Sequence, residues 1–575
     1  MKRYWKYIRP YIQYYILGPC FMMMEVVGDV LLPYMLAKII NQGIAERNVV
    51  YIIKIGVIMG FIAVIMAVGG ILGAWFASKA AMNFGADLRM DLFEKIQQFS
   101  FQNIDNFSTG SLITRLTNDI TQIQNMIMMT LRMCLRSPGI LIGAMVMAFV
   151  ISPKLAAIFI IVLPVLAVLI VVIMRRAFPQ FRTLQEKLDA LNSCIQEGLV
   201  GIRLIKSFVR GDYEEMRFEK RNQQLKEANL TAMKTMLLYT PLMTLALNIT
   251  TVVVVWSGGN MIVTGNMQVG DLTAFTNYIV QIMSSLTMLS IAFLNWARAI
   301  ASFRRVGEVL DEKIDLTDEN AKHKDRAVCE GSVEFQNVSF RYYKNSPEWV
   351  IENISFKLEA GKTLGIIGST GSGKSTLVSM IPRLYDTDEG TVLVDGINVR
   401  DYGLKPLREG IGMVLQNNTL FSGSITENLK WGDEDADEKA VRKAAQNAQA
   451  AGFIDSFKDG YRTRLEQSGN NVSGGQKQRL CIARALLKCP KILILDDSTS
   501  AVDTATERAI REALHSEYKD MTKIIIAQRI RSVMDADEIL VLDNGKTAGF
   551  GTHEQLLADC PVYREIYDVQ NGREE

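Results

Sequence analysis

The sequence of 575 residues predicts a helical membrane domain with six spans, followed by a soluble α/β domain. Residues 10–300 contain long uncharged apolar runs, whereas residues 301–575 mix charged residues with short apolar stretches, as soluble domains do. In the second half a glycine-rich loop follows a predicted strand and precedes a predicted helix, which is typical of an α/β fold. The two halves of the chain therefore differ in fold class: the first is a helical membrane domain and the second a soluble α/β domain.

The overall composition excludes few classes of protein. A net charge of +2 gives no indication of nucleic-acid binding. The seven cysteines form no CxxC pair, so we predict neither a disulfide framework nor a thiolate metal site. Residues 1–9 mix bases with aromatics and precede no cleavage-type apolar core. We expect an amphipathic segment that lies on the membrane surface, with an unstructured tail as the alternative.

A membrane span needs about 20 mostly apolar residues. The segments that meet this requirement are 14–40, 52–79, 128–152, 155–177, 236–264 and 271–297. The connections after the second and fourth segments are long, and the one after the fourth is rich in Arg and Lys. The positive-inside rule places this connection in the cytoplasm, and both termini with it. The sequence thus predicts a multi-pass protein of the cytoplasmic membrane.

Two acids, Glu25 and Asp29, lie within the first span and share one helix face because they are four residues apart. Acids inside a membrane are costly and commonly face a cavity. One interpretation is therefore a polar lining of a substrate cavity. The other is a structural pair with a base or a neighbouring helix dipole, or a position near the membrane interface. A run of three methionines, Met22–Met24, could likewise contact varied apolar ligands or simply pack.

Residues 1–310 form the predicted membrane domain, 311–330 a polar linker and 331–575 the soluble domain. The soluble domain opens with predicted strands within 332–342 and 349–368. The second of these runs into a loop that matches GxxxxGK[ST] between a strand and a helix. Its residues are Gly368, Ser369, Thr370, Gly371, Ser372, Gly373, Lys374, Ser375 and Thr376.

This loop predicts a phosphate site. Its backbone N–H groups would surround phosphates, Lys374 would reach the β- and γ-phosphates, and Ser375 would bind Mg²⁺. Further along, four apolar residues form a predicted buried strand, 492–495, that ends in Asp496. An acid on a neighbouring strand suits the magnesium shell. The two features together predict a nucleotide-binding domain.

Between these features lies the segment Ser473, Gly474, Gly475 and Gln476. With this segment in this position, the chain resembles an ATP-binding cassette (ABC) half-transporter of the exporter type, with six spans fused to one α/β P-loop NTPase cassette. The resemblance covers nearly the whole chain and implies ATP and Mg²⁺ as cofactors. By resemblance, Tyr342 would stack on adenine, Gln416 would contact Mg²⁺ together with Ser375 and Asp496, and Ser500–Asp503 would cross to a partner cassette.

The resemblance also implies a dimer. Two cassettes would meet head to tail, each ATP lying between one P-loop and the other cassette's Ser473–Gln476 segment. Coupling segments near 103–110 and 212–218 would rest on the cassettes.

The sequence departs from the family pattern in the catalytic positions. The family carries a glutamate directly after the magnesium acid and a histidine that contacts the γ-phosphate, where this chain has Asp497 and Gln528. Aspartate is one methylene shorter, and glutamine can hydrogen-bond but cannot carry a charge or move a proton. Another departure is Gln467, at a position that is usually acidic. In this family, such losses are the mark of a heterodimer with one degenerate site.

We therefore predict an ATPase-coupled exporter subunit that works with a second half-transporter, in contact with membrane lipid, on amphiphilic small molecules and not on nucleic acid. This chain would supply the P-loop side of the degenerate site and the signature segment of the competent one. The alternatives are a peptide exporter, a nucleotide-gated channel or regulatory half-transporter, and a slow homodimeric exporter.

Overall fold

The computed structural model describes residues 2–344, 346–498 and 501–571, except the side chains of residues 2, 290, 291, 293–295, 297, 298 and 571. The chain divides into two compact units. The first comprises residues 1–97 and 109–311, and the second comprises 98–108 and 312–575. A short segment of the N-terminal half thus belongs to the C-terminal unit.

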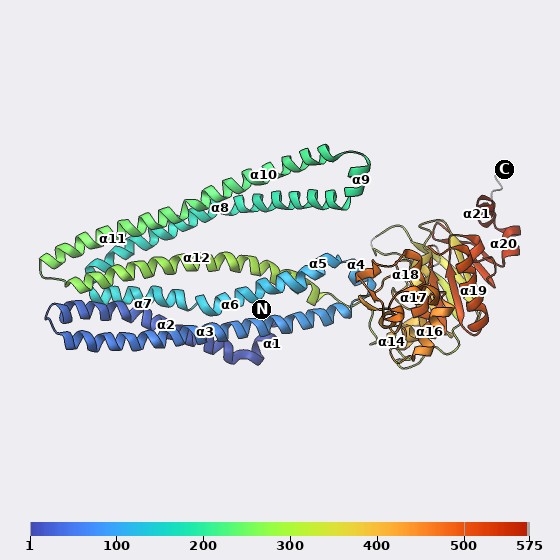
Figure 1. The fold of residues 1–575 in the computed structure, drawn as a ribbon, viewed down its shortest axis with the longest axis horizontal. Helices are drawn as coiled ribbons and strands as arrows, with labels where there is room; N and C mark the ends of the chain where they lie inside the picture. The colour runs from blue at the N-terminus through green and yellow to red at the C-terminus, as the bar shows by residue number, and fades with distance from the viewer. Residues whose placement is uncertain (1, 345, 499–500, 572–575) are drawn as a thin grey trace. The chain divides into compact units, whose positions relative to one another are not determined.

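The first unit is entirely helical in the described residues. Its α-helices are α1 (Trp5–Ile8), α2 (Ile12–Lys38), α3 (Val49–Gln97), α5 (Thr109–Thr114), α6 (Ile120–Met133), α7 (Arg136–Ile151), α8 (Pro153–Val200), α9 (Ile202–Ser207), α10 (Gly211–Leu237), α11 (Tyr239–Val263) and α12 (Val269–Asp311). Two π-helical segments, Ile39–Ile44 and Arg115–Asp119, extend α2 and join α5 to α6. Helices α8 and α10 lie side by side, and α9 joins them (Figure 1).

Five helical stretches among the described residues are long and apolar enough to cross a membrane. They cover the first five predicted spans, apart from the last residue of the third and of the fifth. Several continue well beyond them: α3 and α8 run on through polar sequence to Gln97 and Val200. The sixth predicted span, 271–297, falls in helix α12, where several side chains lie outside the described set. A membrane domain is confirmed, and the count of six spans stays a prediction.

The N-terminal segment is held against other helices. The Tyr7 ring is buried, and its hydroxyl donates to the Asp91 carboxylate of α3 at 2.9 Å. The Tyr4 hydroxyl donates to the carbonyl of Phe303 on α12 at 3.0 Å. Trp5 remains about half exposed. The segment is therefore helical and anchored on α3 and α12, which contradicts the unstructured tail, whereas its position on the membrane surface stays a prediction.

The second unit contains one helix from the N-terminal half, α4 (Phe101–Asp105), and an α/β domain. Its strands are β1 (Val333–Phe340), β2 (Ile351–Leu358), β3 (Thr363–Gly368), β4 (Glu389–Val394), β5 (Ile397–Asn398), β6 (Ile411–Val414), β7 (Gly423–Ser424), β8 (Arg464–Leu465), β9 (Ile492–Asp496), β10 (Thr522–Ile526), β11 (Glu538–Asp543) and β12 (Lys546–Gly551). The helices are α13 (Lys374–Ser379), α14 (Leu404–Glu409), α15 (Ile425–Leu429), α16 (Glu438–Asn447), α17 (Ala451–Ser456), α18 (Gly474–Leu487), α19 (Thr504–Glu517), α20 (His553–Asp559) and α21 (Pro561–Asn571).

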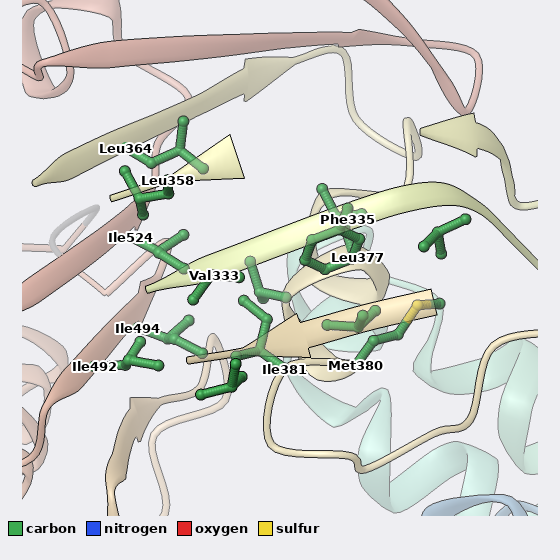
Figure 2. Close-up of a cluster of buried hydrophobic side chains, with 14 of the residues drawn as sticks. Val333, Phe335, Leu358, Leu364, Leu377, Met380, Ile381, Ile492, Ile494 and Ile524 are labelled. Carbon is green, nitrogen blue, oxygen red and sulfur yellow. The ribbon is translucent and has the colours of Figure 1, made fainter. Parts of the chain in front are cut away.

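Strand β9 shows why the central sheet is buried on both faces. Its side chains alternate, as in any strand. Ile492 and Ile494 join the cluster between the two larger sheets, together with Leu377 of α13 (Figure 2). Leu493 and Leu495 join a second cluster with the helices on the opposite face. A continuous apolar run, rather than an alternating one, is what a covered parallel strand requires.

The order of the six-stranded sheet is β12-β11-β3-β10-β9-β6, and all pairs except β11 with β12 are parallel. The loops after β3, β10, β9 and β6 therefore meet at one edge of the sheet, because parallel strands share the direction of their carboxyl ends. The prediction of neighbouring strands for the P-loop and Asp496 was wrong in one respect: β10 lies between β3 and β9.

Helix α4, in the first predicted coupling segment, packs on the α/β domain. Ser100 and Asn103 form a capping box at its start. The Asn103 side chain is buried and donates to the carbonyl of Lys313 at 2.8 Å. At the other end, the Tyr385 hydroxyl donates to the Asp105 carboxylate at 2.9 Å. The first coupling segment thus contacts the α/β domain of its own chain.

Asp395, in the turn between β4 and β5, fixes the start of the domain. Its carboxylate accepts four backbone N–H bonds, from Cys329, Glu330, Gly331 and Ser332, at 2.7–3.1 Å. Asp395→Ala leaves these donors without their acceptor, and we expect a loss of about 2 kcal/mol. For a domain of this size, the unfolding midpoint should fall by about 4–8 °C in the full-length chain.

Two variants control this measurement. Asp395→Asn keeps one acceptor oxygen but places an NH2 donor against two of the four N–H groups, so it should lose at least half as much. Asp435→Ala removes an exposed carboxylate of the same domain and should leave the midpoint unchanged. Equal midpoints for Asp395→Ala and Asp435→Ala would show that the four bonds contribute nothing to stability.

Candidate nucleotide-binding site

A cavity of about 310 Å³ opens at the edge of the sheet where the four loops meet. It is lined by Tyr342, Val350, Thr370, Gly371, Gly373, Lys374, Ser375, Thr376, Gln416, Asp496, Asp497, Ile526 and Gln528. Most of the predicted nucleotide-binding residues are therefore brought together, from loops that are far apart in the sequence.

The P-loop backbone needs its glycines. Gly371 and Gly373 have φ values of +87° and +89°, a region that side chains with a Cβ rarely occupy. A Cβ on Gly373 would also lie 2.9 Å from the carbonyl oxygen of Val350. The ammonium of Lys374 donates to the carbonyls of Gly368 and Ser369 at 2.9 and 2.7 Å. The loop thus bends around its lysine.

The predicted magnesium ligands lie side by side. The Ser375 hydroxyl donates to Asp496 Oδ1 at 2.9 Å, and Gln416 lines the same cavity. Hydroxyl, carboxylate and amide oxygens suit Mg²⁺. Within the described ranges, no group of three or more His, Cys, Asp or Glu residues could hold a metal by itself. The donor set therefore fits a magnesium ion whose remaining ligands come from phosphate and water.

Burial shifts the pKa values of two groups in the cavity, the Lys374 ammonium and the Asp496 carboxyl. It lowers the pKa of the Lys374 ammonium, against the opposing effect of Asp497 and Asp496. It raises the pKa of Asp496, while the Ser375 hydrogen bond acts in the opposite direction. Metal binding needs the carboxylate form, so Mg²⁺ affinity should begin to fall at a higher pH than for an exposed aspartate as the solution is acidified.

Tyr342 borders the cavity at the end of the first strand. Its hydroxyl lies 2.8 Å from the Thr376 hydroxyl, and its ring meets the Tyr385 ring edge-on at 5.4 Å. The side chain is 37% exposed. The ring is therefore positioned by two contacts and still accessible to a stacking base.

Asp497 and Gln528, the two departures from the family pattern, contact each other. Gln528 Nε2 donates to Asp497 Oδ2 at 2.8 Å, and Gln416 also forms a hydrogen bond with this carboxylate. Asp497 has a left-handed backbone, with φ of +47°, which aspartate tolerates better than longer side chains. Burial raises its pKa, and the Gln528 bond opposes this shift. One carboxylate oxygen of Asp497 is thus engaged in a hydrogen bond with the Gln528 amide.

The signature segment starts helix α18. Ser473 accepts a bond from the Gln476 N–H, and Gln476 Oε1 accepts one from the Ser473 N–H, so the pair forms a capping box. These residues do not line the P-loop cavity, and neither does Asp503, which caps α19. Ser500 lies outside the described residues.

The acids of the first span meet a base. Arg136, the first residue of α7, places Nη2 2.9 Å from Glu25 Oε1 and 3.3 Å from Asp29 Oδ2. These contacts are the ones expected if the two acids form a structural pair with a base. The cluster contains one more acid than base. Of the methionine run, Met22 is buried against Gly73, whereas Met23 and Met24 are about 40% exposed.

Two neighbours of the site could not be predicted from the sequence. Val350 contributes a backbone oxygen beside Gly373, and Tyr385 supports Tyr342 from the segment after α13. Neither belongs to a motif, and their positions follow from how the smaller sheet packs beside the larger one.

Comparison with known proteins agrees with this arrangement. The family model described as "ABC transporter transmembrane region" matches residues 15–286, and the one described as "ABC transporter" matches residues 351–500. The chain is 39% identical to the uncharacterized ABC transporter ATP-binding protein YfiB of Bacillus subtilis, over 100% of this chain and 99% of that protein. It is 33% identical to the "Putative multidrug export ATP-binding/permease protein YgaD" of the same species, over 99% of both.

A solved structure, a bacterial Atm1-family ABC exporter with ATP bound, shares the fold with a TM-score of 0.81. It is 24% identical, over 98% of each chain. Both the membrane region and the ATP-binding domain are thus covered by proteins of one kind. The chain belongs to the ABC transporter family, and it has the fold of an ABC exporter half-transporter, with one transmembrane region and one ATP-binding domain on a single chain.

Proposed function

We propose that this chain is one subunit of a heterodimeric ABC exporter of the cytoplasmic membrane, with both termini in the cytoplasm. Its P-loop face forms a degenerate ATP site that binds ATP but hydrolyses it slowly. The observation that carries this proposal is the hydrogen bond between Gln528 and Asp497.

Hydrolysis needs a carboxylate that can polarise an attacking water. The shorter side chain of Asp497 withdraws its carboxylate by about 1.5 Å relative to glutamate, and a misplacement of about 1 Å can cost about a hundredfold in rate. One of its oxygens already accepts the Gln528 amide, which cannot receive a proton. Both effects weaken the chemical step without removing the groups that bind ATP.

The binding groups are complete. Lys374 would contact the β- and γ-phosphates, Tyr342 would stack on the base, and Ser375, Asp496 and Gln416 would hold Mg²⁺. Magnesium, when bound, would neutralise part of the phosphate charge. The site therefore suits nucleotide retention.

The signature segment has the family sequence and an ordered start of α18. Ser473 to Gln476 would complete a competent site whose P-loop, glutamate and histidine come from a second half-transporter. Closure of the two cassettes on ATP would be transmitted to the spans through α4 and through residues 212–218 at the start of α10.

For the substrate we propose amphiphilic small molecules, with cations favoured. The Glu25, Asp29 and Arg136 cluster has an excess of acid, which disfavours anions within the membrane. The name of the relative YgaD is in keeping with drug-like substrates. Lipids share the same amphiphilic chemistry.

The proposal predicts how ATPase activity depends on a partner. The purified full-length chain alone should hydrolyse ATP slowly. Co-purification with a second half-transporter that carries glutamate and histidine at the corresponding positions should raise phosphate release about a hundredfold. Changing that partner's glutamate to glutamine should abolish the gain. Vigorous hydrolysis by this chain alone would instead show a homodimer in which Asp497 and Gln528 suffice.

A further inference from the structure

The C-terminal helix α21 contacts the loop that carries Gln528. The side-chain amide of Gln570 makes two hydrogen bonds with the backbone of this loop. Its Nε2 donates to the carbonyl of Gln528 at 2.8 Å, and its Oε1 accepts the N–H of Ile530 at 2.8 Å. One amide therefore fixes two backbone groups, on either side of Arg529, relative to helix α21.

Helix α21 is itself firmly placed. Tyr563 is fully buried, and its hydroxyl lies 2.7 Å from Nδ1 of His553 on α20. The ring belongs to a core cluster that includes Ile530 of the same loop and Ile367 of β3, the strand that leads into the P-loop. The helix that presents Gln570 thus shares a core with the strand that positions the phosphate-binding loop.

The rest of the loop is held from another side. Arg511 of α19 donates to the carbonyl of Arg531 at 2.7 Å, and the Ser532 hydroxyl donates to Glu507 at 2.5 Å. These contacts fix the turn that follows Ile530. Gln570 acts at the other end of the loop, on the carbonyl of Gln528, which is the residue that faces the cavity.

We infer that Gln570 is a positioning residue for the nucleotide site, holding Gln528 where its amide meets Asp497 and the γ-phosphate position. The effect is indirect: Gln570 does not line the cavity but fixes the backbone from which Gln528 Nε2 reaches Asp497 Oδ2 at 2.8 Å. This inference rests on the proposed function, because it assumes that Gln528 contributes to binding ATP rather than ADP.

The test compares the affinities of the purified full-length chain for Mg-ATP and Mg-ADP. Gln570→Ala should lower the preference for ATP over ADP by about twofold to tenfold, the range of one hydrogen bond. The ADP affinity should stay within about twofold, since the γ-phosphate is absent. Gln570→Glu keeps an acceptor for Ile530 but places an oxygen against the Gln528 carbonyl, so it should lower the preference at least as much.

Val569→Ala is the matched control. It shortens an exposed side chain on the next residue of α21 and should change neither affinity. A double-mutant cycle then asks whether Gln570 acts through Gln528. In the Gln528→Ala background, Gln570→Ala should cause no further loss of ATP preference, although each single change causes one.

The outcomes separate the inference from the proposed function. If Gln528→Ala lowers the ATP preference but Gln570→Ala does not, the inference is wrong and the proposed site stands. Equal losses of ATP and ADP affinity in Gln570→Ala, or additive losses in the double variant, would show a general structural role and would also overturn it. If Gln528→Ala itself changes nothing, the assigned role of Gln528 fails, and the inference fails with it.

Discussion

Changing Asp497 to glutamate and Gln528 to histidine together is expected to raise ATP hydrolysis by the purified chain about a hundredfold. Glutamate would extend the carboxylate toward the attacking water. Histidine would replace an amide that cannot accept or transfer a proton. The measurement is steady-state phosphate release in lipid nanodiscs at saturating Mg-ATP.

The single change Asp497→Glu should gain little. The Gln528 amide, which cannot take up a proton, would still engage the carboxylate. Adding Lys374→Ala to the double variant should remove the gain, which ties the activity to this P-loop. Full turnover from Asp497→Glu alone would contradict this account of the degenerate site.

Lys374→Ala is expected to weaken ATP binding by about 30-fold or more. Lys374 is the one base among the described residues that line the cavity, where it faces Asp496 and Asp497. Without it, two acids would confront the polyphosphate with no cation from the protein. Truncating one partner of a buried charge pair costs about 2–5 kcal/mol, which corresponds to about 30-fold to several thousand-fold in affinity.

The change is measured as the dissociation constant of Mg-ATP for the full-length chain. Lys405→Ala removes an exposed lysine of α14 and is the matched control, with no expected effect. A direction with pH follows as well. Because burial lowers the pKa of Lys374, ATP affinity should fall with rising pH earlier than for a lysine of ordinary pKa, and Lys374→Ala should lose this alkaline limb. An unchanged affinity in Lys374→Ala would place the nucleotide elsewhere.

The sequence by itself determined the features that depend on neighbouring residues. Apolar runs of sufficient length identify membrane helices because the bilayer sets their length, and the strand, glycine-rich loop and Lys374 are contiguous. The segment Ser473–Gln476 is equally local. Asp497 and Gln528 could also be identified as departures, since the family pattern fixes which residue types those positions usually carry.

The boundaries of the helices and the order of the strands were harder to predict from the sequence. The spans extend into long helices because the polar sequence after residues 79 and 177 still has helical character and continues the same helix. The strand between the P-loop and Asp496 is β10, which comes later in the chain than either. Such an order depends on how crossover helices pack on both faces of the sheet, which no local pattern specifies.

Tertiary structure alone decided which side chains meet. Arg136 pairs with Glu25 and Asp29 from more than 100 residues away, Gln528 reaches Asp497 across adjacent strands, and Gln570 holds the backbone of Gln528 from the last helix. Each is a hydrogen bond or ion pair that forms only at a separation of about 3 Å. Hydrophobic patterning places an element on a face, but separations this short are set by the packing of the whole domain, for which the sequence offers no local signal.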